Sequence, residues 1–469
     1  MMTGKIAAII QEPYVAQGFG EESYHNVTTL FPVGLAILLI ASIFTLVLPR
    51  RSAILPMIAI QTLVPASQRI VIFGLDFHFA RVLVLIGLVR VLLNGENRWL
   101  RPVKLDKLIL TWCLATVAIY SVQHGHVGAF IYKLGWTVDT LGIYCLARLW
   151  IRSRADIDRI AGVFLVLGVL AAAMFLYEWT TQTNMYSWVG GVSPYTMIRD
   201  GKLRCVGPFK HPILAGTFWA GVLPWVMGRW WTLPQQRGRT FLGLWGIVLV
   251  IIATASSTPL IGLLVGLGSC AAFSLRNSMS AIRWGVVLAL ASLHLVMEKP
   301  VWHLISRVSV VSGSTGYHRY RLINAAVEHW RDWFLLGTDS TAGWGYYLFD
   351  VTNQFVKEAI DGGIVCLGLF VAYIWVAFSY LGCLWRADRR MRGGGYRYWT
   401  LGCAIFAQCV MFLGISVNHA PQNLFIWLVP IGASAGLYQT LRFSQPRPGA
   451  RPGSVEGLVL PEPDPSATP

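Results

Sequence analysis

Charged residues are scarce in this sequence. Only 13% of its 469 residues are Asp, Glu, Lys or Arg, whereas 55% are hydrophobic. Soluble domains carry about a quarter charged residues, so the chain lacks the surface that water requires. Its apolar residues come in blocks long enough to cross a hydrocarbon core of about 30 Å. The composition therefore predicts an all-α integral membrane protein.

The motifs of several enzyme classes are also missing. The sequence has no Gly-rich Walker loop, no HExxH and no GxSxG, and its eight cysteines form no CxxC and no Cys/His metal spacing. The one DxD, at 156–158, lies in a short connection with no domain around it to bind a sugar nucleotide. These absences disfavour an ATPase, a zinc protease and a nucleotide-sugar glycosyltransferase. We expect no metal and no cofactor.

The net charge of +16 could suggest a nucleic-acid partner. In a membrane protein the simpler explanation is topological, because Lys and Arg hold connections on the cytoplasmic side. We therefore expect no nucleic acid.

Residues 1–29 also lack the basic start, apolar stretch and cleavage site of a signal peptide.

The apolar blocks predict about 12 to 13 transmembrane helices. The second block is the weakest, because Gln61, Pro65, Gln68 and Arg69 interrupt it. The predicted spans are 30–49, 53–73, 76–93, 106–123, 129–149, 158–178, 212–230, 240–256, 258–275, 281–297, 362–384, 398–416 and 422–441.

Every second connection between these spans is basic, which places the amino terminus outside and the carboxyl terminus inside. The predicted divisions are an N-terminal segment (1–29), the first helices (30–297), a large extracytoplasmic loop (298–361), the last three helices (362–441) and a tail (442–469). The tail is rich in Pro, Gly and Ser and is predicted to be disordered in the cytoplasm.

Two outside connections are long, and function is expected there. The first, 179–211, holds Arg199, Lys202, Arg204 and Lys210 against one acid, Asp200. Because the positive-inside rule disfavours such a cluster, a fixed anion such as a phosphate is the functional interpretation. The structural interpretation is that these cations pair with acids of the other loop or with lipid headgroups.

The second loop, 298–361, contains an amphipathic pattern over 315–337. Such a helix can lie at the membrane surface or cover a cavity between spans. Arg319 would point among the apolar residues, so it either precedes the helix or has a buried partner. The predicted apolar face consists of Leu322, Ile323, Ala326, Val327, Trp330, Trp333 and Phe334.

A charge inside the hydrocarbon is costly and points to function by default. Asp139 lies near the middle of the fifth span, with Arg81 and Lys133 nearer the outer ends of theirs. An ion pair between Asp139 and one of these cations is as good an explanation as a catalytic role.

Three stretches resemble the O-antigen ligase and polymerase-like membrane proteins. The first is RCVGPFKHPILAG (204–216), where an outside arginine leads into a span. The second is HRYR (318–321), followed by an apolar helix with Trp330 and a turn at Gly337. The third is TNQ (352–354), leading to Gly362 and Gly363.

The resemblance implies a fold like that of the GT-C glycosyltransferases and a metal-independent glycosyltransferase in the bacterial inner membrane, active outside the cytoplasm. Its donor would be a glycan on undecaprenyl diphosphate, and its acceptor a glycan or a lipid-linked molecule. Membrane lipids would surround it. Arg204, Arg319, Arg321 and Lys210 would bind the diphosphate, because guanidinium groups suit phosphate oxygens. His211, Asn353, Trp330 and Asp139 would support them.

One position departs from the family pattern. The ligases usually carry a His before the Asn of the third motif, whereas this chain has Thr352, a poor base. The acceptor proton could go instead to one of four residues, so ligation and polymerisation both stay open. The candidate bases are His318, His329, Glu328 and Asp350.

The alternative function is a transporter or flippase of a lipid-linked glycan or another amphiphile. The intramembrane Asp139 and Arg81 would suit one. Against it, the sequence shows no repeated halves and no matched Gly/Pro-broken spans.

Overall fold

The computed structural model describes residues 28–307, 316–388, 395–417 and 420–444. The predicted N-terminal segment 1–29 lies almost wholly outside the described residues, as does the predicted tail 442–469.

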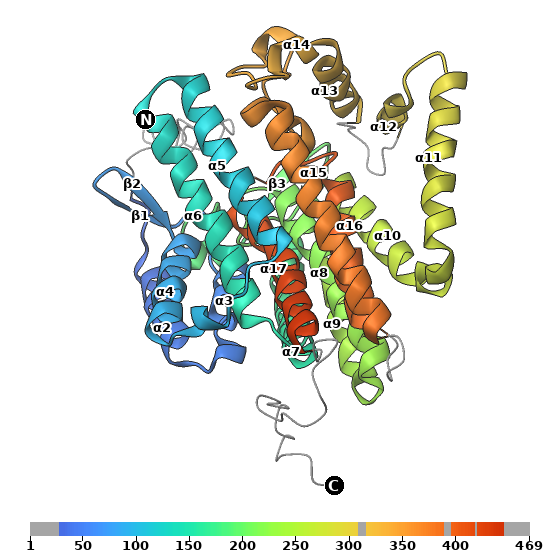
Figure 1. Ribbon diagram of the computed structural model, residues 1–469. Helices are drawn as coiled ribbons and strands as arrows, with labels where there is room; N and C mark the ends of the chain where they lie inside the picture. The colour runs from blue at the N-terminus through green and yellow to red at the C-terminus, as the bar shows by residue number, and fades with distance from the viewer. Residues whose placement is uncertain (1–27, 308–315, 389–394, 418–419, 445–469) are drawn as a thin grey trace, which may run out of the picture.

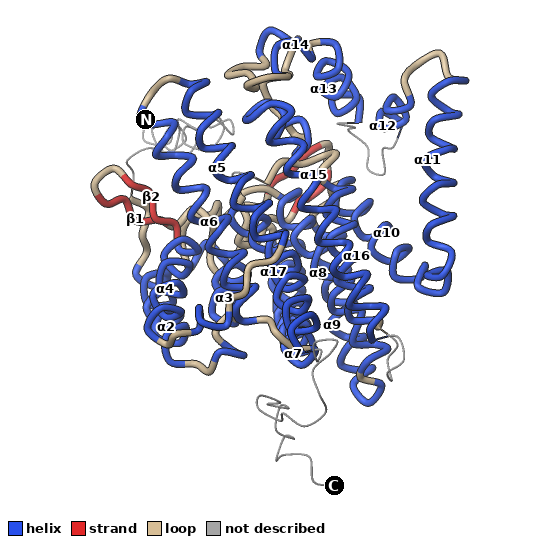
Figure 2. The backbone as a smooth tube through the Cα atoms, in the orientation of Figure 1, coloured by secondary structure: helices blue, strands red, loops and turns tan. Residues whose placement is uncertain are grey.

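Helices dominate the fold and run side by side along one direction, with very few strands (Figures 1 and 2). Twelve described helices have 15 or more residues. They are α2 (Pro32–Val47), α4 (Phe79–Leu93), α5 (Lys104–His124), α6 (Val127–Trp150), α7 (Arg154–Thr181), α8 (Pro212–Thr232), α9 (Arg237–Ala253), α10 (Ser257–Ala271), α11 (Met279–Val296), α15 (Gln354–Asp388), α16 (Tyr396–Met411) and α17 (Pro421–Ser444).

Short elements connect these helices. Two antiparallel hairpins pair Arg69 with His78 and Met197 with Arg204. The short helices and strands are α3 (Leu55–Leu63), α12 (Leu304–Arg307), α13 (Gly316–Glu328), α14 (Trp330–Trp333), β1 (Arg69–Ile72), β2 (Leu75–His78), β3 (Met197–Arg199) and β4 (Lys202–Arg204). Short 3₁₀ helices lie at Arg50–Ser52, Glu96–Trp99, Met185–Trp188, Pro234–Gln236, Ala272–Ser278, Val301–His303 and Ala342–Trp344.

An all-α membrane protein is confirmed, since six described helical stretches are long and apolar enough to cross a bilayer. Other helices are shorter, or carry charges: α6 has 24 residues but contains Lys133, Asp139 and Arg148. The larger number of spans stays a prediction. The six stretches are Lys104–His124, Arg154–Thr181, Pro234–Ala253, Ser257–Val296, Gln354–Asp388 and Pro421–Phe443.

The predicted second span, 53–73, is wrong as a continuous helix. Helix α3 has nine residues and rises only about 14 Å, less than half the hydrocarbon core. The polar interruption explains the difference. Gln68 donates to the carbonyl oxygens of Val189 and Gly190 (3.1 Å each), and Arg69 forms an ion pair with Asp76. The chain therefore turns back as the β1–β2 hairpin.

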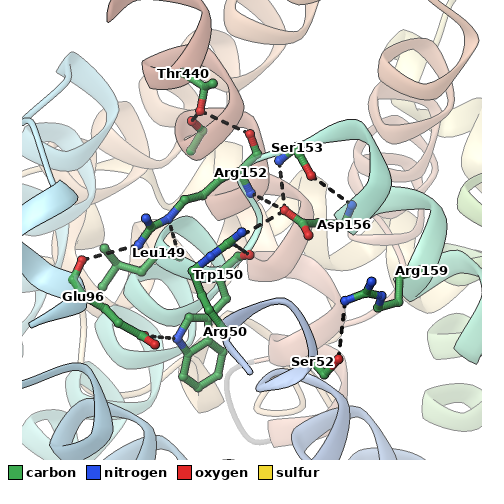
Figure 3. A network of polar contacts seen from close by, with 11 residues as sticks. Arg50, Ser52, Glu96, Leu149, Trp150, Arg152, Ser153, Asp156, Arg159 and Thr440 are labelled. Carbon is green, nitrogen blue, oxygen red and sulfur yellow. Dashed lines mark hydrogen bonds and ion pairs between the residues drawn. The ribbon is translucent and has the colours of Figure 1, made fainter. Parts of the chain in front are cut away.

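Basic connections that are distant in sequence meet at one end of the bundle, which we call the basic end. Figure 3 shows Arg50, Arg152 and Arg159 around the start of α7. Arg50 Nη1 donates to the Trp150 carbonyl (2.5 Å) and lies 3.6 Å from the carboxylate of Asp156. Arg159 and Arg152 also bond to neighbouring connections, at Ser52 and Glu96. Three loops thus form one surface.

Helix α13 covers the opposite end of the bundle (Figure 1), and we call residues 316–353 the roof. Leu322, Ala325 and Ala326 are buried against α15, whereas Val327, Trp330 and Phe334 of the predicted apolar face are exposed. Trp330 and Phe334 differ from the prediction because α13 ends at Glu328, so the helical spacing does not continue into α14. Val327 is still inside α13, at the edge of the predicted face. Helix α11 stands apart from the other spans, and none of its residues is buried.

Helix α15 is broken at Gly362 and Gly363, whose backbone angles are not helical. The carbonyl oxygen of Phe334 accepts a hydrogen bond from the Ile364 N–H there (2.9 Å). A Cβ on Gly363 would lie 2.4 Å from the carbonyl oxygen of Leu335, and φ is +63°. Only glycine fits this position without strain.

Gly363→Ala should destabilise the protein by about 3 kcal/mol, from the steric contact and the unfavourable φ together. The measurement is the apparent melting temperature of purified protein in detergent. Gly368→Ala in the same helix is the matched control, because no atom lies within 4 Å of the added Cβ. Equal melting temperatures for the two variants would contradict the prediction.

Candidate functional site

Two buried arginines from the two long loops meet at the start of α10. Arg204, the last residue of β4, and Arg319, in α13, are 6% and 7% exposed. Arg204 Nη2 donates to Ser256 Oγ (2.6 Å), and Arg319 Nη2 donates to Thr258 Oγ1 (2.7 Å). Because these hydroxyl groups are two residues apart, both guanidinium groups lie at one turn.

The loop that carries Arg204 is fixed by a buried carboxylate. Glu178 at the end of α7 accepts hydrogen bonds from the backbone N–H groups of Val206 (2.9 Å) and Gly207 (3.0 Å). The Cys205 N–H donates to the last carbonyl of α9 (3.0 Å). These bonds hold Arg204 beside the α9–α10 turn.

The position of Arg319 depends on close packing between the roof and the bundle. Leu322, one turn along α13, is fully buried in a cluster with Val356 of α15. On the other side, a Cβ on Gly414 would lie 2.8 Å from Arg319 Nε and 3.1 Å from Thr258 Oγ1. The absent side chain at Gly414 therefore leaves the room that the guanidinium occupies.

The electrostatics of the two arginines favour an anion. Among the described residues, neither guanidinium forms an ion pair with a carboxylate, and neither Nε has a hydrogen-bond partner. Burial lowers the pKa of both groups; at Arg204 the charge of Arg199 lowers the pKa further and the carboxylate of Asp200 opposes this. An unpaired buried charge costs several kcal/mol unless something neutralises it.

The start of α10 adds positive potential at the same place. Ser256 precedes this 15-residue helix but makes no side-chain cap to it; its hydroxyl donates to the Thr254 carbonyl and accepts from Arg204. Helix amino termini carry a partial positive charge and attract anions. Ala255 in this turn has a φ of +44°, a strained conformation of the kind that gathers at functional sites.

The positive charge of Arg204 acts on the nearby ring of His211. Burial, followed by Arg204 and Arg199, lowers the pKa of His211 to about 4, so the ring is neutral at pH 7. Nδ1 accepts from the Ile213 N–H (3.2 Å), which leaves the ring proton on Nε2. His211 can therefore donate a hydrogen bond from Nε2 but is a poor base.

Asn353 joins the roof to the segment that carries Gly414. Its Oδ1 accepts from the N–H groups of Phe355 (2.9 Å) and Val356 (3.1 Å), which caps α15. Its Nδ2 contacts the Leu413 carbonyl (3.4 Å). Asn353 thus positions the wall against which Arg319 lies.

The four candidate bases occupy different surroundings. His318, beside Arg319, places Nε2 3.2 Å from the Asp350 carbonyl. Donation to that carbonyl would leave Nδ1 as the basic atom. Burial raises the pKa of the Asp350 carboxyl. Glu328 and His329 lie at the end of α13 that is far from Arg319. Glu328 is exposed and accepts a hydrogen bond from Asn324 (2.7 Å). His329 pairs with Asp332 (3.3 Å).

The remaining predicted residues have other groups as neighbours. Lys210 has Arg69 and Asp76 of the first hairpin as its charged neighbours. Arg321 is half-buried and lies beside Gly345. Trp330 is exposed and packs edge-on against Phe334.

Asp139 forms a structural ion pair. Arg81 contacts both of its carboxylate oxygens, Nε to Oδ1 at 3.0 Å and Nη2 to Oδ2 at 2.6 Å, and His78 lies 3.0 Å from Oδ2. Lys133 pairs instead with Asp361 (2.7 Å). The pairing interpretation of these intramembrane charges is thus the one that the geometry supports.

Sequence reasoning missed the hydroxyl groups of Ser256 and Thr258 and the carboxylate of Glu178. The run TASST (254–258) was a usable signal, since three further hydroxyl side chains surround Ser256 in a turn between two apolar spans. Glu178, at the end of a span, gave no signal of its own.

A scan of protein-family models finds none that matches this chain, and a search of curated proteins finds no match either. The functional argument therefore rests on the geometry of the site.

Lys210 should make stability depend on pH. Burial and Arg69 lower its pKa from 10.5 to about 7. Between about pH 7 and 10.5 the unfolded chain then holds a proton that the folded chain lacks, so this contribution to stability rises with pH. Lys210→Met should raise the apparent melting temperature most below pH 7, and the gain should shrink toward pH 10. A gain that is the same at every pH would contradict this.

Proposed function

We propose that this protein transfers a glycan from an undecaprenyl-diphosphate-linked donor to an acceptor hydroxyl at the outer face of the bacterial cytoplasmic membrane. Polymerisation of repeat units and ligation to another lipid are both compatible with the site. The observation that carries the proposal is the pair of buried arginines without a carboxylate, Arg204 and Arg319, at the start of α10.

A lipid diphosphate that acts as a leaving group needs fixed positive charges around it. When its bond to the sugar breaks, negative charge develops on the phosphate oxygens, and fixed cations in a dry site stabilise that charge. Each guanidinium has donors beyond the one bonded to a hydroxyl, and their planar geometry suits phosphate.

His318 is the best placed of the four candidate bases. In the proposed step the acceptor oxygen attacks the anomeric carbon, and the bond from that carbon to the diphosphate oxygen breaks. The acceptor proton passes to His318 Nδ1, while the bond from Nε2 to the Asp350 carbonyl orients the ring. The diphosphate leaves with its charge matched by the arginines.

The topology supports an outer location for this chemistry. Basic connections face the cytoplasm in membrane proteins, and the site lies under the roof, at the end of the bundle opposite the basic end. The lipid tail of the donor could stay in the bilayer while its diphosphate reaches the roof. Surrounding membrane lipids are the other expected partners.

One feature favours the alternative, a transporter or flippase of a lipid-linked glycan or another amphiphile. Helix α15 is discontinuous at Gly362 and Gly363, and broken helices occur at transporter binding sites. The two functions differ in what accumulates after deletion of the protein. A lost transferase leaves the lipid-linked glycan in the outer leaflet, whereas a lost flippase leaves it in the inner leaflet.

Arg204→Gln and Arg319→Gln should each lower glycan transfer about a hundredfold or more, because charge stabilisation in the transition state is lost. Protein levels should change little, since each substitution removes an unpaired buried charge. The measurement is polymer formed from purified lipid-linked donor. Arg331→Gln, an exposed arginine on α14, is the control. Near wild-type transfer by both variants would reject the site.

His318→Gln should lower kcat for transfer by about 10²–10⁴ and leave the KM for the donor nearly unchanged, because a general base acts in the chemical step. The glutamine amide can still donate to the Asp350 carbonyl. Glu328→Gln, on the exposed side of α13, should match wild type. If Glu328→Gln shows the larger loss, the assignment of the base is wrong.

A further inference from the structure

Three aromatic rings stand exposed on the roof, in a segment to which the transfer step gives no role. Tyr346, Tyr347 and Phe349 are 77%, 56% and 62% exposed. The ring centroids of Tyr346 and Tyr347 lie 4.6 Å apart, and those of Tyr347 and Phe349 lie 5.5 Å apart. The three rings form a continuous surface, which we call the aromatic ledge. Clustered exposed aromatics of this kind mark an interaction surface.

The ledge is held firmly by the residues around it. Leu348, between its rings, is 1% exposed and packs in a cluster with Leu322 and Val356. The Leu348 carbonyl accepts from Thr341 Oγ1 (2.7 Å), and its N–H donates to the Gly345 carbonyl (3.1 Å).

The backbone of the ledge also shows strain. Tyr347 has a φ of +61°, which bulky residues rarely adopt and which persists only where the surroundings impose it. Such strain, in a segment whose rings are nevertheless exposed, fits a preformed binding surface.

The ledge adjoins the proposed catalytic residues. A Cβ on Gly345 would lie 3.0 Å from Arg321 Nη2, so this guanidinium lies against the base of the ledge. Asp350 directly follows Phe349, and its carbonyl oxygen contacts His318. The rings therefore begin within a few residues of the proposed base.

The chemistry of the ledge suits a saccharide better than a bilayer surface. Sugar rings have apolar C–H faces that pack on the electron-rich faces of aromatic rings, and their hydroxyl groups donate to carboxylates. Residues 338–356 contain Asp339 and Asp350 and no Lys or Arg. An anionic lipid surface attracts clusters of Lys and Arg, whereas this segment contains neither and the guanidinium of Arg321 at its base is a single charge.

We propose that the aromatic ledge binds the saccharide chain of the glycan substrate and delivers it to the site under the roof. This inference rests on the proposed glycan transfer for its substrate class. The rings supply sequence-tolerant stacking along the chain, and Asp350 and Arg321 supply hydrogen bonds where the chain reaches the site.

Binding of lipid-free oligosaccharides tests the ledge directly. The probe is the set of fragments that mild acid releases from the surface polysaccharide of the host, measured by saturation-transfer NMR with the full chain in lipid nanodiscs. The substitutions Tyr346→Ala, Tyr347→Ala and Phe349→Ala together should weaken binding about tenfold or more. The control combines Phe73→Ala and Tyr195→Ala, two exposed rings on other loops, and should bind as wild type does.

Two outcomes would contradict the proposal: no binding by the wild-type protein, or equal binding by wild type and the triple variant. A special case of the second is equal binding with a lower melting temperature of the triple variant in nanodiscs. The last result would make the rings a membrane-interface anchor. The binding assay needs no turnover, so it is independent of the transfer assay. The wild-type protein could bind the oligosaccharides while the Arg204 and Arg319 variants transfer glycan at the full rate. That result would contradict the proposed transfer site and leave the proposed saccharide binding by the ledge intact.

Discussion

The burial of two positive charges without a negative partner is the constraint on which the site depends. Arg204 and Arg319 lie more than a hundred residues apart in the sequence but reach the same turn, and the turn offers them hydroxyl groups rather than carboxylates. In a dry region this arrangement is costly. It is retained only if the rest of the structure holds it in place, and an arriving anion would relieve the cost.

Most other buried cations in the described chain differ from these two. Arg69, Arg90, Lys133 and Arg148 each form an ion pair with a carboxylate. The buried Arg229 donates instead to the Asp158 carbonyl and to Gln236. An ion pair with a carboxylate compensates the cost of burying a cation. Arg204 and Arg319 have hydroxyl groups as partners in place of a carboxylate or a carbonyl, and this difference is the basis of the proposed anion site.

The roof shows why local sequence patterns predicted its helices only in part. The 3.6-residue spacing predicted a single helix over 315–337, but the chain ends α13 at Glu328 and starts a new short helix at Trp330. The loop at 334–338 must also fit the break of α15 at Gly363. That tertiary requirement outweighed the continuation of one apolar face, so Trp330 and Phe334, beyond the end of α13, are exposed.

The sequence by itself determined the membrane class, the grouping of the basic connections and the two loops where function was expected. These features follow from hydrophobic blocks and from charge, which act over short stretches of chain. It indicated that Arg319 either precedes the helix or has a buried partner, but it could not determine that this partner is Thr258, or that Asp139 pairs with Arg81. Such pairings depend on which helices pack together. Only the tertiary structure brings Ser256 and Thr258 between two distant loops, because contacts across more than fifty residues leave no periodic trace in the sequence.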